Sequence, residues 1–390
     1  MAKRDGIVID TWLLGAFLTL MLLGIIMVYS ASAFYAQHYF NDHLFFLKRH
    51  GFNLVVGIFA GVAALAVPYH RLRGWTWIAL LGGFVILVWA LFVAEGRWIH
   101  IGPIHFQAVD VAKFCLILFF ADSLSRKEEI LQRFGEGLFP HLVYVGVFGL
   151  LVVFQPDFSS TVMLVLVALT MLFAAPVRLH HLFLTGLAFL PFAVAVVWRS
   201  AYKLARVKSF LDPSGDIKGS GYQVHQSLVS LGHGGITGLG FAGSTQKMFF
   251  LPEAHTDFIF AIIGEEWGLI GTLFVVGLFW IIAWRGMRLA LRMTDRFYRY
   301  LVVGITAHFF YYAVVNMMVT LGLLPATGLP LPFISYGGTA LVFSCIYAAI
   351  LLKIASTGLG MPDGVPRMPR QGTPGRPVYL AQALYRNRRP

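Results

Sequence analysis

Apolar residues fill most of this chain in runs of about twenty, separated by shorter polar stretches. A run of that length crosses the ~30 Å hydrocarbon core of a bilayer as an α-helix, because a helix rises about 1.5 Å per residue. The pattern predicts ten membrane-spanning helices, near residues 11–33, 51–68, 75–94, 108–123, 141–154, 158–175, 180–198, 257–284, 300–323 and 337–357. The predicted fold is therefore all-α and polytopic. The first run is expected to stay as a helix, because it is too long for a cleaved signal sequence and lacks a cleavage pattern.

The polar stretches divide the chain further. Segments 1–10 and 358–390 lie outside the predicted membrane domain 11–357, and segment 199–256 is predicted to form a long extracytoplasmic loop between the seventh and eighth helices. That loop is rich in aromatic residues and glycine, and loops of such length are usually functional or disordered. We interpret it as functional. The Pro-, Gly- and Arg-rich tail predicts disorder, with contact to anionic lipid headgroups as the alternative to a solvated tail.

Composition and charge support a membrane protein and exclude other classes. The 390 residues are 58% hydrophobic and only 12% charged, with a mean hydropathy of +0.74, which a soluble domain of this size cannot bury. The net charge of +12 does not indicate a nucleic-acid partner, because much of it lies in short inter-helix stretches such as "HRLR" (70–73) and "VRLHH" (177–181). These basic stretches fall on one side and mark the cytoplasm, so both termini are predicted to be cytoplasmic. Cys115 and Cys345 lie in apolar runs, which argues against disulfides.

Charged residues inside or beside the predicted spans are the first functional candidates, because burying them in a bilayer is costly. Lys113 either pairs with Asp110 on one helix face, or joins Arg97 in presenting positive charge to a phosphate group. Asp157 follows a proline at a helix start, where a capping role is favoured over a functional one. The positive excess of segment 199–256 would attract an anionic ligand.

The stretch "LPEAHTDFIF" (251–260) places three titratable groups at the start of the eighth helix. Asp257 is either an N-terminal charge on that helix, with Thr256 as its cap, or a reactive group. Helical geometry places Glu265 about 12 Å deeper than Asp257, with Glu266 facing the opposite side. One glutamate could share a cavity with Asp257 while the other contacts a neighbouring helix. The sequence leaves these alternatives open.

Five segments resemble the SEDS family, which includes RodA, FtsW and SpoVE. They are residues 210–271, "MVYSASA" (27–33), "GRWIHIGPIHFQ" (96–107), "QPDFSST" (155–161) and "PLPFISYGGTAL" (330–341). They occur in the family's order, and the resemblance covers about residues 10–357. The stretch "GSTQKMFFLPEAHTDF" is more similar to the FtsW/SpoVE branch than to RodA. One departure is that Ala108, Val109 and Asp110 replace the family's "P-S/A-E".

The resemblance implies a peptidoglycan glycosyltransferase that polymerises lipid II at the outer face of the bacterial cytoplasmic membrane. It implies a class B penicillin-binding protein and other divisome proteins as partners, a septal location, and Asp257 as the catalytic residue. Expected substrate-binding residues are Arg97, Lys113, Arg206, Gln226, Ser244, Gln246, Lys247, Glu253, His255 and Ser335, with Asp110, Asp157 and Glu265 in supporting roles. Asp257 would remove the proton from the acceptor hydroxyl directly, or hold a divalent cation such as Mg²⁺ or Mn²⁺ that acidifies it. No other cofactor is expected.

Four other functions remain open at this point. They are a lipid II flippase, a non-catalytic scaffold for the penicillin-binding protein, a RodA-type polymerase for elongation, and an enzyme acting on another polyprenyl-linked glycan. The ionisable residues cluster in the outer half of the predicted spans, apart from Glu265 and Glu266. This distribution favours an outward-facing enzyme over a transport path across the bilayer.

Overall fold

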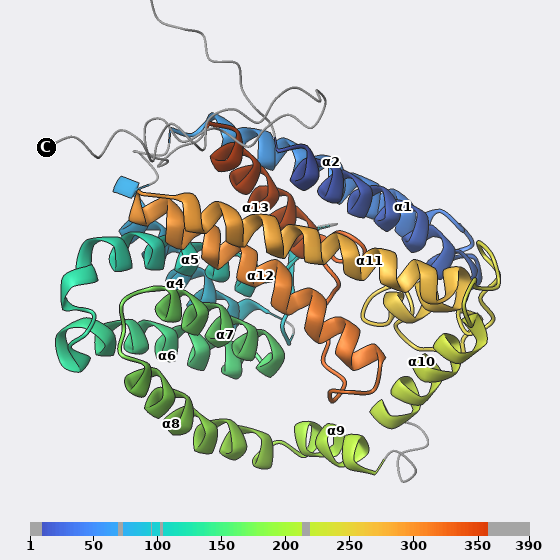
Figure 1. Cartoon of the computed structure of the whole chain (residues 1–390). Coiled ribbons are helices and arrows are strands. Elements are labelled where there is room, and N and C mark those ends of the chain that lie inside the picture. Colours follow the sequence, from blue (N-terminus) through green and yellow to red (C-terminus); the bar gives the residue numbers. More distant parts are fainter. Residues whose placement is uncertain (1–9, 69–72, 95, 102–103, 213–218, 358–390) are drawn as a thin grey trace, which may run out of the picture.

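The computed structural model describes residues 10–68, 73–94, 96–101, 104–212 and 219–357, and ten helices there correspond to the ten predicted spans (Figure 1). They are α1 (Thr11–Phe40), α2 (Phe45–Ala66), α4 (Thr76–Val93), α5 (Ala108–Lys127), α6 (Phe139–Phe154), α7 (Phe158–Ala174), α8 (Leu179–Trp198), α11 (Ile259–Arg292), α12 (Arg296–Thr320) and α13 (Gly338–Thr357). Eight helical segments in the described part are long and apolar enough to cross a membrane, whereas α7 is shorter and α5 carries several charges. The polytopic helical fold is thus confirmed. The predictions for residues 1–9 and 358–390 lie outside the described residues.

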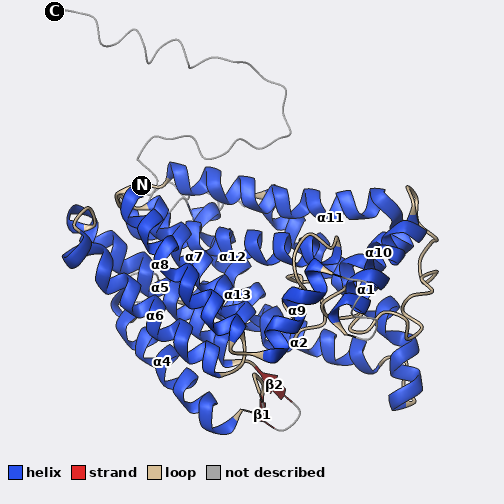
Figure 2. Ribbon diagram, turned by 90° about the horizontal axis from the view of Figure 1, so that it is seen from below, coloured by secondary structure: helices blue, strands red, loops and turns tan. Residues whose placement is uncertain are grey.

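The long segment before α11 is not a simple loop. It contains α9 (Ala201–Leu211) and α10 (Ser220–Gly234), which continue from α8 around one side of the bundle (Figure 1). A second addition is a small antiparallel hairpin of β1 (Ile99–Ile101) and β2 (Ile104–Phe106), at the edge of the helical body in Figure 2. A short 3₁₀ turn, η1 (Glu128–Ile130), and a π-helical turn, η2 (Phe134–Leu138), connect α5 to α6.

Small residues allow α2 and α13 to pack closely. A Cβ atom added to Gly57 would lie 2.9 Å from the sulfur of Cys345, and one added to Gly61 would lie 3.1 Å from the Cys345 carbonyl oxygen. Lipid provides no hydrophobic driving force between helices. Close backbone approach therefore supplies much of the attraction between α2 and α13. The two glycines at this spacing therefore hold the first helical pair against the last helix.

Helix α11 breaks at Gly268, where φ is +66°. The loop after α10 satisfies the backbone groups freed by the break: Leu239 N–H donates to the Glu265 carbonyl and Leu269 N–H donates to the Gly235 carbonyl, both at 2.9 Å. Irregular backbone at membrane depth is tolerated where protein supplies such partners. The loop is thereby anchored into the helical core.

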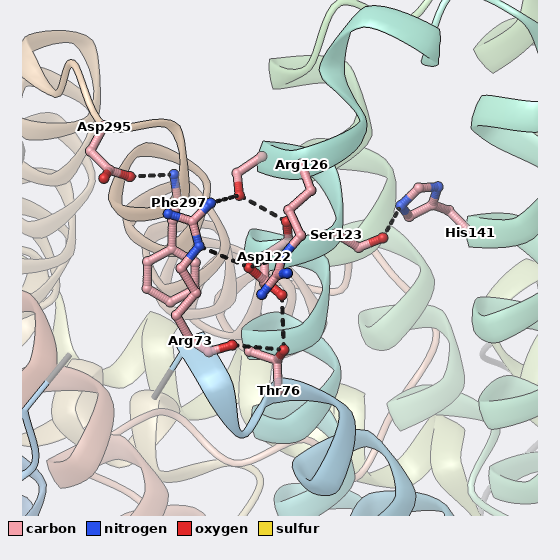
Figure 3. Close-up of polar contacts among 9 residues, drawn as sticks. Arg73, Thr76, Asp122, Ser123, Arg126, His141, Asp295 and Phe297 are labelled. Carbon is pink, nitrogen blue, oxygen red and sulfur yellow. Dashed lines mark hydrogen bonds and ion pairs between the residues drawn. The ribbon is translucent and has the colours of Figure 1, made fainter. Parts of the chain in front are cut away.

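A polar cluster lies around Asp122, near the C-terminal end of α5 (Figure 3). The buried carboxylate of Asp122 accepts hydrogen bonds from Thr76 Oγ1 at 3.0 Å, Arg73 Nε at 3.1 Å and Arg126 Nε at 2.8 Å. These bonds join the start of α4 to α5. Asp122 is fully partnered, so we interpret the cluster as structural.

Candidate active site

Asp257 lies on the turn 251–258, just before α11 begins at Ile259. The turn is held through its backbone: Ser335 Oγ donates to the Thr256 carbonyl at 2.6 Å, and Tyr336 N–H donates to the His255 carbonyl at 2.9 Å. The Asp257 carboxylate itself makes no hydrogen bond or ion pair with any described residue. The expectation that Thr256 caps the helix is wrong, because its hydroxyl contacts Glu253 and α11 has no side-chain cap. Asp257 is therefore a half-buried carboxylate that is free to meet a ligand.

Two arginines flank this carboxylate. Arg97 precedes the hairpin and donates from Nη1 to the Gly328 carbonyl at 3.3 Å, and Arg206 of α9 donates to the Ala326 carbonyl at 3.0 Å. Both are close enough to act electrostatically on Asp257. The hydrogen bonds of Arg97 and Arg206 to residues 326–328 bring these three parts of the chain together near Asp257.

Burial raises the pKa of Asp257 to about 6, while the Arg97 guanidinium opposes the rise and the Glu253 carboxylate adds to it. A carboxylate tuned toward neutrality is better suited to accept a proton than one with an ordinary pKa near 4. His255, enclosed by aromatic rings, has its pKa lowered to about 4 by burial, so it is neutral at pH 7. Of these two side chains, Asp257 is the one whose charge changes near pH 6.

Asn316 was not predicted from the sequence, although it is a polar side chain in the middle of α12. It is 1% exposed, and its Nδ2 group donates to both the Asp257 carbonyl and the Leu329 carbonyl at 2.8 Å. The side chain joins the turn that carries Asp257 to the irregular segment 321–337. A polar residue inside a predicted span was the available signal.

Replacing Asn316 with alanine should leave two carbonyl groups without their donor and loosen the Asp257 turn. We expect kcat to fall roughly 10- to 100-fold with a smaller change in KM, because misplacing a reactive group by about 1 Å has effects of this size. The measurement is turnover of the wild-type and Asn316→Ala proteins in the polymerisation assay described below. Thr320→Val is the control, since Thr320 Oγ1 contacts only the Met317 carbonyl of its own helix. Equal losses in both variants would contradict the positioning role.

A chain of buried polar groups joins Gln107 to helices α5, α7, α12 and α13. Gln107 Nε2 donates to Asp157 at 2.6 Å, Thr339 Oγ1 donates to Asp110 at 2.7 Å, and Lys113 Nζ lies 2.9 Å from Asp110 and contacts the Tyr312 hydroxyl. The Asp110–Lys113 pair is therefore present, and Lys113 is 5% exposed. A cavity of about 20 Å³, room for roughly one water molecule, lies against this pair. Asp157 also accepts from Ser160 N–H at 3.0 Å, so it caps α7 as expected.

Four predicted residues of segment 244–265 meet away from Asp257, in a buried cluster against α1. Glu265 accepts from Ser244 Oγ at 2.5 Å, and the Lys247 ammonium lies 2.7 Å from Glu266 and 3.0 Å from Ser30 Oγ. Gln246 is 7% exposed beside them. The hypothesis that one glutamate shares a cavity with Asp257 is wrong, because the loop packed on α11 encloses Glu265 through Ser244 and Thr245. Its second part is confirmed, since Glu266 accepts a hydrogen bond from Ser30 Oγ of the neighbouring helix α1 at 2.6 Å. Lys247 therefore already has an internal partner.

The other predicted residues occupy different positions. Ser335 lies under the Asp257 turn and joins it to Leu331 N–H, Glu253 is exposed, and Gln226 is half-buried on α10. Within the described ranges, no group of three His, Cys, Asp or Glu side chains could together hold a metal ion. These side chains alone do not form a conventional metal centre, and a divalent cation at Asp257 would need substrate phosphates among its ligands.

The fold and the site define a class: a polytopic helical membrane protein whose loops gather an unpartnered, arginine-flanked carboxylate beside the bundle. The family described as "Cell cycle protein", which groups FtsW, RodA and SpoVE, matches residues 10–358. The chain belongs to this family.

Curated relatives extend over nearly the same length. The probable peptidoglycan glycosyltransferase FtsW of Trichlorobacter lovleyi is 39% identical over 354 residues, covering 89% of this chain and 93% of the relative. The stage V sporulation protein E of Bacillus subtilis is 37% identical over 345 residues, covering 87% and 94%.

Solved structures share the fold. A chain of a peptidoglycan synthase complex, described as coordinating polymerization and crosslinking, has a TM-score of 0.74 at 24% identity, covering 90% of this chain and 98% of that chain. The rod shape determining protein RodA of Thermus thermophilus has a TM-score of 0.66 at 21% identity with the same coverage. At these identities, the likeness concerns the fold alone.

Proposed function

We propose that this protein is a peptidoglycan glycosyltransferase that polymerises lipid II, the undecaprenyl-pyrophosphate-linked disaccharide-pentapeptide, at the outer face of the bacterial cytoplasmic membrane. The observation that carries the proposal is the Asp257 carboxylate, which has no partner among the described residues, has a raised pKa of about 6, and is within electrostatic range of both Arg97 and Arg206. FtsW-named relatives at 37–39% identity support the same activity. They also support a role in septal synthesis during cell division.

The reaction needs one base and a cationic environment. Asp257 takes the proton of the acceptor sugar hydroxyl as that oxygen attacks the anomeric carbon of the donor sugar. A new glycosidic C–O bond forms, the bond from that carbon to the pyrophosphate oxygen breaks, and the electron pair leaves with the undecaprenyl pyrophosphate. Arg97 and Arg206 stabilise the charge on the departing pyrophosphate, since guanidinium groups suit phosphate oxygens. The proton remains on the Asp257 carboxyl group.

A divalent cation remains a proposal of its own. Mg²⁺ or Mn²⁺ would be held by Asp257 together with pyrophosphate oxygens, because Mg²⁺ is commonly bound by one or two carboxylates plus substrate phosphates. Bound there, it would lower the pKa of the acceptor hydroxyl. The steps above do not depend on it. Polymerisation measured with a chelator, and then with Mg²⁺ or Mn²⁺ added back, distinguishes a mechanism that uses a divalent cation from one that does not.

We place the protein in the cytoplasmic membrane with both termini inside, at the septum, with a class B penicillin-binding protein as its partner. The basic stretches that the predicted topology puts on one side of the membrane support this orientation. The structural neighbour in a peptidoglycan synthase complex supports a crosslinking partner. Other divisome proteins are expected to join the pair.

The acid limb of the pH–rate profile should report the Asp257 carboxyl group. Activity is expected to fall as pH drops through about 6, because protonation removes the base. Arg97→Gln removes a positive charge that lowers the pKa, so the limb should move to higher pH. Glu253→Gln removes a negative charge that raises it, so the limb should move to lower pH. Profiles of kcat/KM for the three proteins give the test, and shifts of the same sign in both variants would contradict the assignment.

The deciding experiment is glycan polymerisation from purified lipid II by the chain co-purified with its penicillin-binding partner, with transpeptidation inhibited. Ladders of glycan strands are expected. A flippase would instead move labelled lipid II between the leaflets of proteoliposomes without making polymer. A scaffold would make no polymer and move no lipid while still binding its partner. Either result, obtained with an intact complex, overturns the proposal.

A further inference from the structure

Five aromatic rings form a surface at the outer end of α1, which we call the aromatic platform. Phe249 lies against four rings of α1, with centroid distances of 5.3 Å to Phe34, 5.9 Å to Tyr35, 5.1 Å to His38 and 5.9 Å to Tyr39. Despite these contacts, Phe249 is 44% exposed and Tyr39 is 59% exposed. The platform therefore presents ring faces and edges to its surroundings.

Phe249 occupies a strained backbone position. Its φ angle is +69°, a region that bulky side chains rarely adopt. Such strain persists only where surrounding structure enforces it, and it concentrates at functional sites. Here the next residues, 251–258, form the turn that carries Asp257. In this conformation the Phe249 ring lies against the rings of α1.

The platform continues into the candidate active site. The His255 ring lies 5.7 Å from that of Tyr35 and 4.4 Å from that of Phe46, and His255 is two residues before Asp257. A ligand that extends away from Asp257 on this side would meet the platform next. Three polar side chains belong to the same parts of the chain: Gln37 of α1, Asn41 directly after α1, and Thr256 of the turn 251–258.

The height of the platform argues against a lipid contact within the hydrocarbon core. Helix α1 has 30 residues and is about 45 Å long, whereas the hydrocarbon core is about 30 Å thick. The predicted span ends at residue 33, so the four rings of α1 that belong to the platform are expected in the headgroup and water region. Aromatic residues at that level often face the membrane interface. These rings, although partly exposed, also pack onto the segment that leads to Asp257.

We propose that the aromatic platform is a saccharide-binding subsite that holds the N-acetylhexosamine chain of the elongating glycan beside Asp257. The inference rests on the proposed glycosyltransferase function and adds where its polymer binds. A sugar ring has apolar C–H faces and a rim of hydroxyl groups, so it matches a surface of aromatic rings edged by polar side chains. Rigid aromatic side chains supply large contact area at a low entropy cost. A polymer held there would stay near the site between successive additions.

The test uses the full chain in nanodiscs with its penicillin-binding partner. Phe249→Leu and Tyr39→Leu each remove a ring and keep an apolar side chain, and Phe92→Leu is the control at an 83% exposed aromatic residue of α4. One measurement is binding of an uncrosslinked tetrasaccharide of alternating N-acetylglucosamine and N-acetylmuramic acid, by saturation-transfer NMR. The other is the length of glycan made from lipid II.

We expect about five- to tenfold weaker tetrasaccharide binding and shorter glycans for each platform variant, with the control unchanged. Binding measured in an Asp257→Asn background separates this inference from the function on which it rests. If that protein binds the tetrasaccharide and the platform variants lose it, the subsite stands even where polymerisation fails. Unchanged binding and glycan length in both variants overturns the subsite. Loss of the penicillin-binding partner, with tetrasaccharide binding intact, overturns it in favour of a protein contact.

Discussion

Asp257→Asn is expected to reduce the rate of glycan polymerisation by about 10²- to 10⁴-fold. The amide keeps the size of the side chain but cannot accept the proton of the acceptor hydroxyl, and general base catalysis contributes rate factors of this size. The carboxylate has no hydrogen-bond partner among the described residues, so its removal should leave the fold intact. Lipid II binding through Arg97 and Arg206 should persist, and the loss should appear in kcat. The measurement is strand formation from lipid II under single- and multiple-turnover conditions.

Asp42→Asn provides the matched control for this variant. Asp42 is a carboxylate of the segment between α1 and α2, and it pairs with the exposed Lys48 at 2.8 Å. Its loss should leave polymerisation within about twofold of the wild type, since exposed ion pairs contribute little. If the Asp257→Asn protein is folded, holds its partner and polymerises like the wild type, Asp257 has only a structural role. The base would then have to be sought elsewhere.

Much of the fold could be predicted because each span is specified by its own residues. A helix in lipid satisfies its backbone groups internally, so a run of twenty apolar residues determines both its conformation and its environment. The same local reasoning identified the Asp110–Lys113 pair, three residues apart on one helix, and the cap at Asp157. These features, which depend on residues within one turn of each other, were accessible from sequence, although the local cap proposed at Thr256 was not found.

Features that depend on distant segments were not accessible. The break in α11 at Gly268 is satisfied by the loop around Gly235 and Leu239, and no local pattern places that loop there. On a continuous helix that begins at 257, one of Glu265 and Glu266 could have shared a cavity with Asp257 while the other contacted a neighbouring helix. The structure instead begins the helix at Ile259 and encloses both glutamates with the loop. The long-range contact of Asn316 with the Asp257 turn was missed for the same reason.

Lys247→Met should destabilise the protein by about 3–5 kcal/mol, the cost of leaving one partner of a buried ion pair uncompensated. Lys247 Nζ lies 2.7 Å from Glu266 Oε1, and both side chains are nearly fully buried, with the second carboxylate oxygen of Glu266 lacking a hydrogen-bond partner. The pair joins the loop 242–247 to α11 and, through Ser30, to α1. A loss of this size is a large fraction of the stability of a typical protein. Thermal unfolding in nanodiscs measures it.

Two further variants decide what Lys247 does. Lys48→Met, which breaks an exposed pair, should leave the unfolding temperature nearly unchanged. The double variant Lys247→Met with Glu266→Gln removes both charges and should recover most of the lost stability, because no unpaired buried charge remains. If Lys247 serves only to hold the loop, polymerisation should recover together with stability. If stability returns and polymerisation does not, the Lys247 ammonium contacts substrate, as expected in the sequence analysis. The loop 242–247 must then open to expose Lys247.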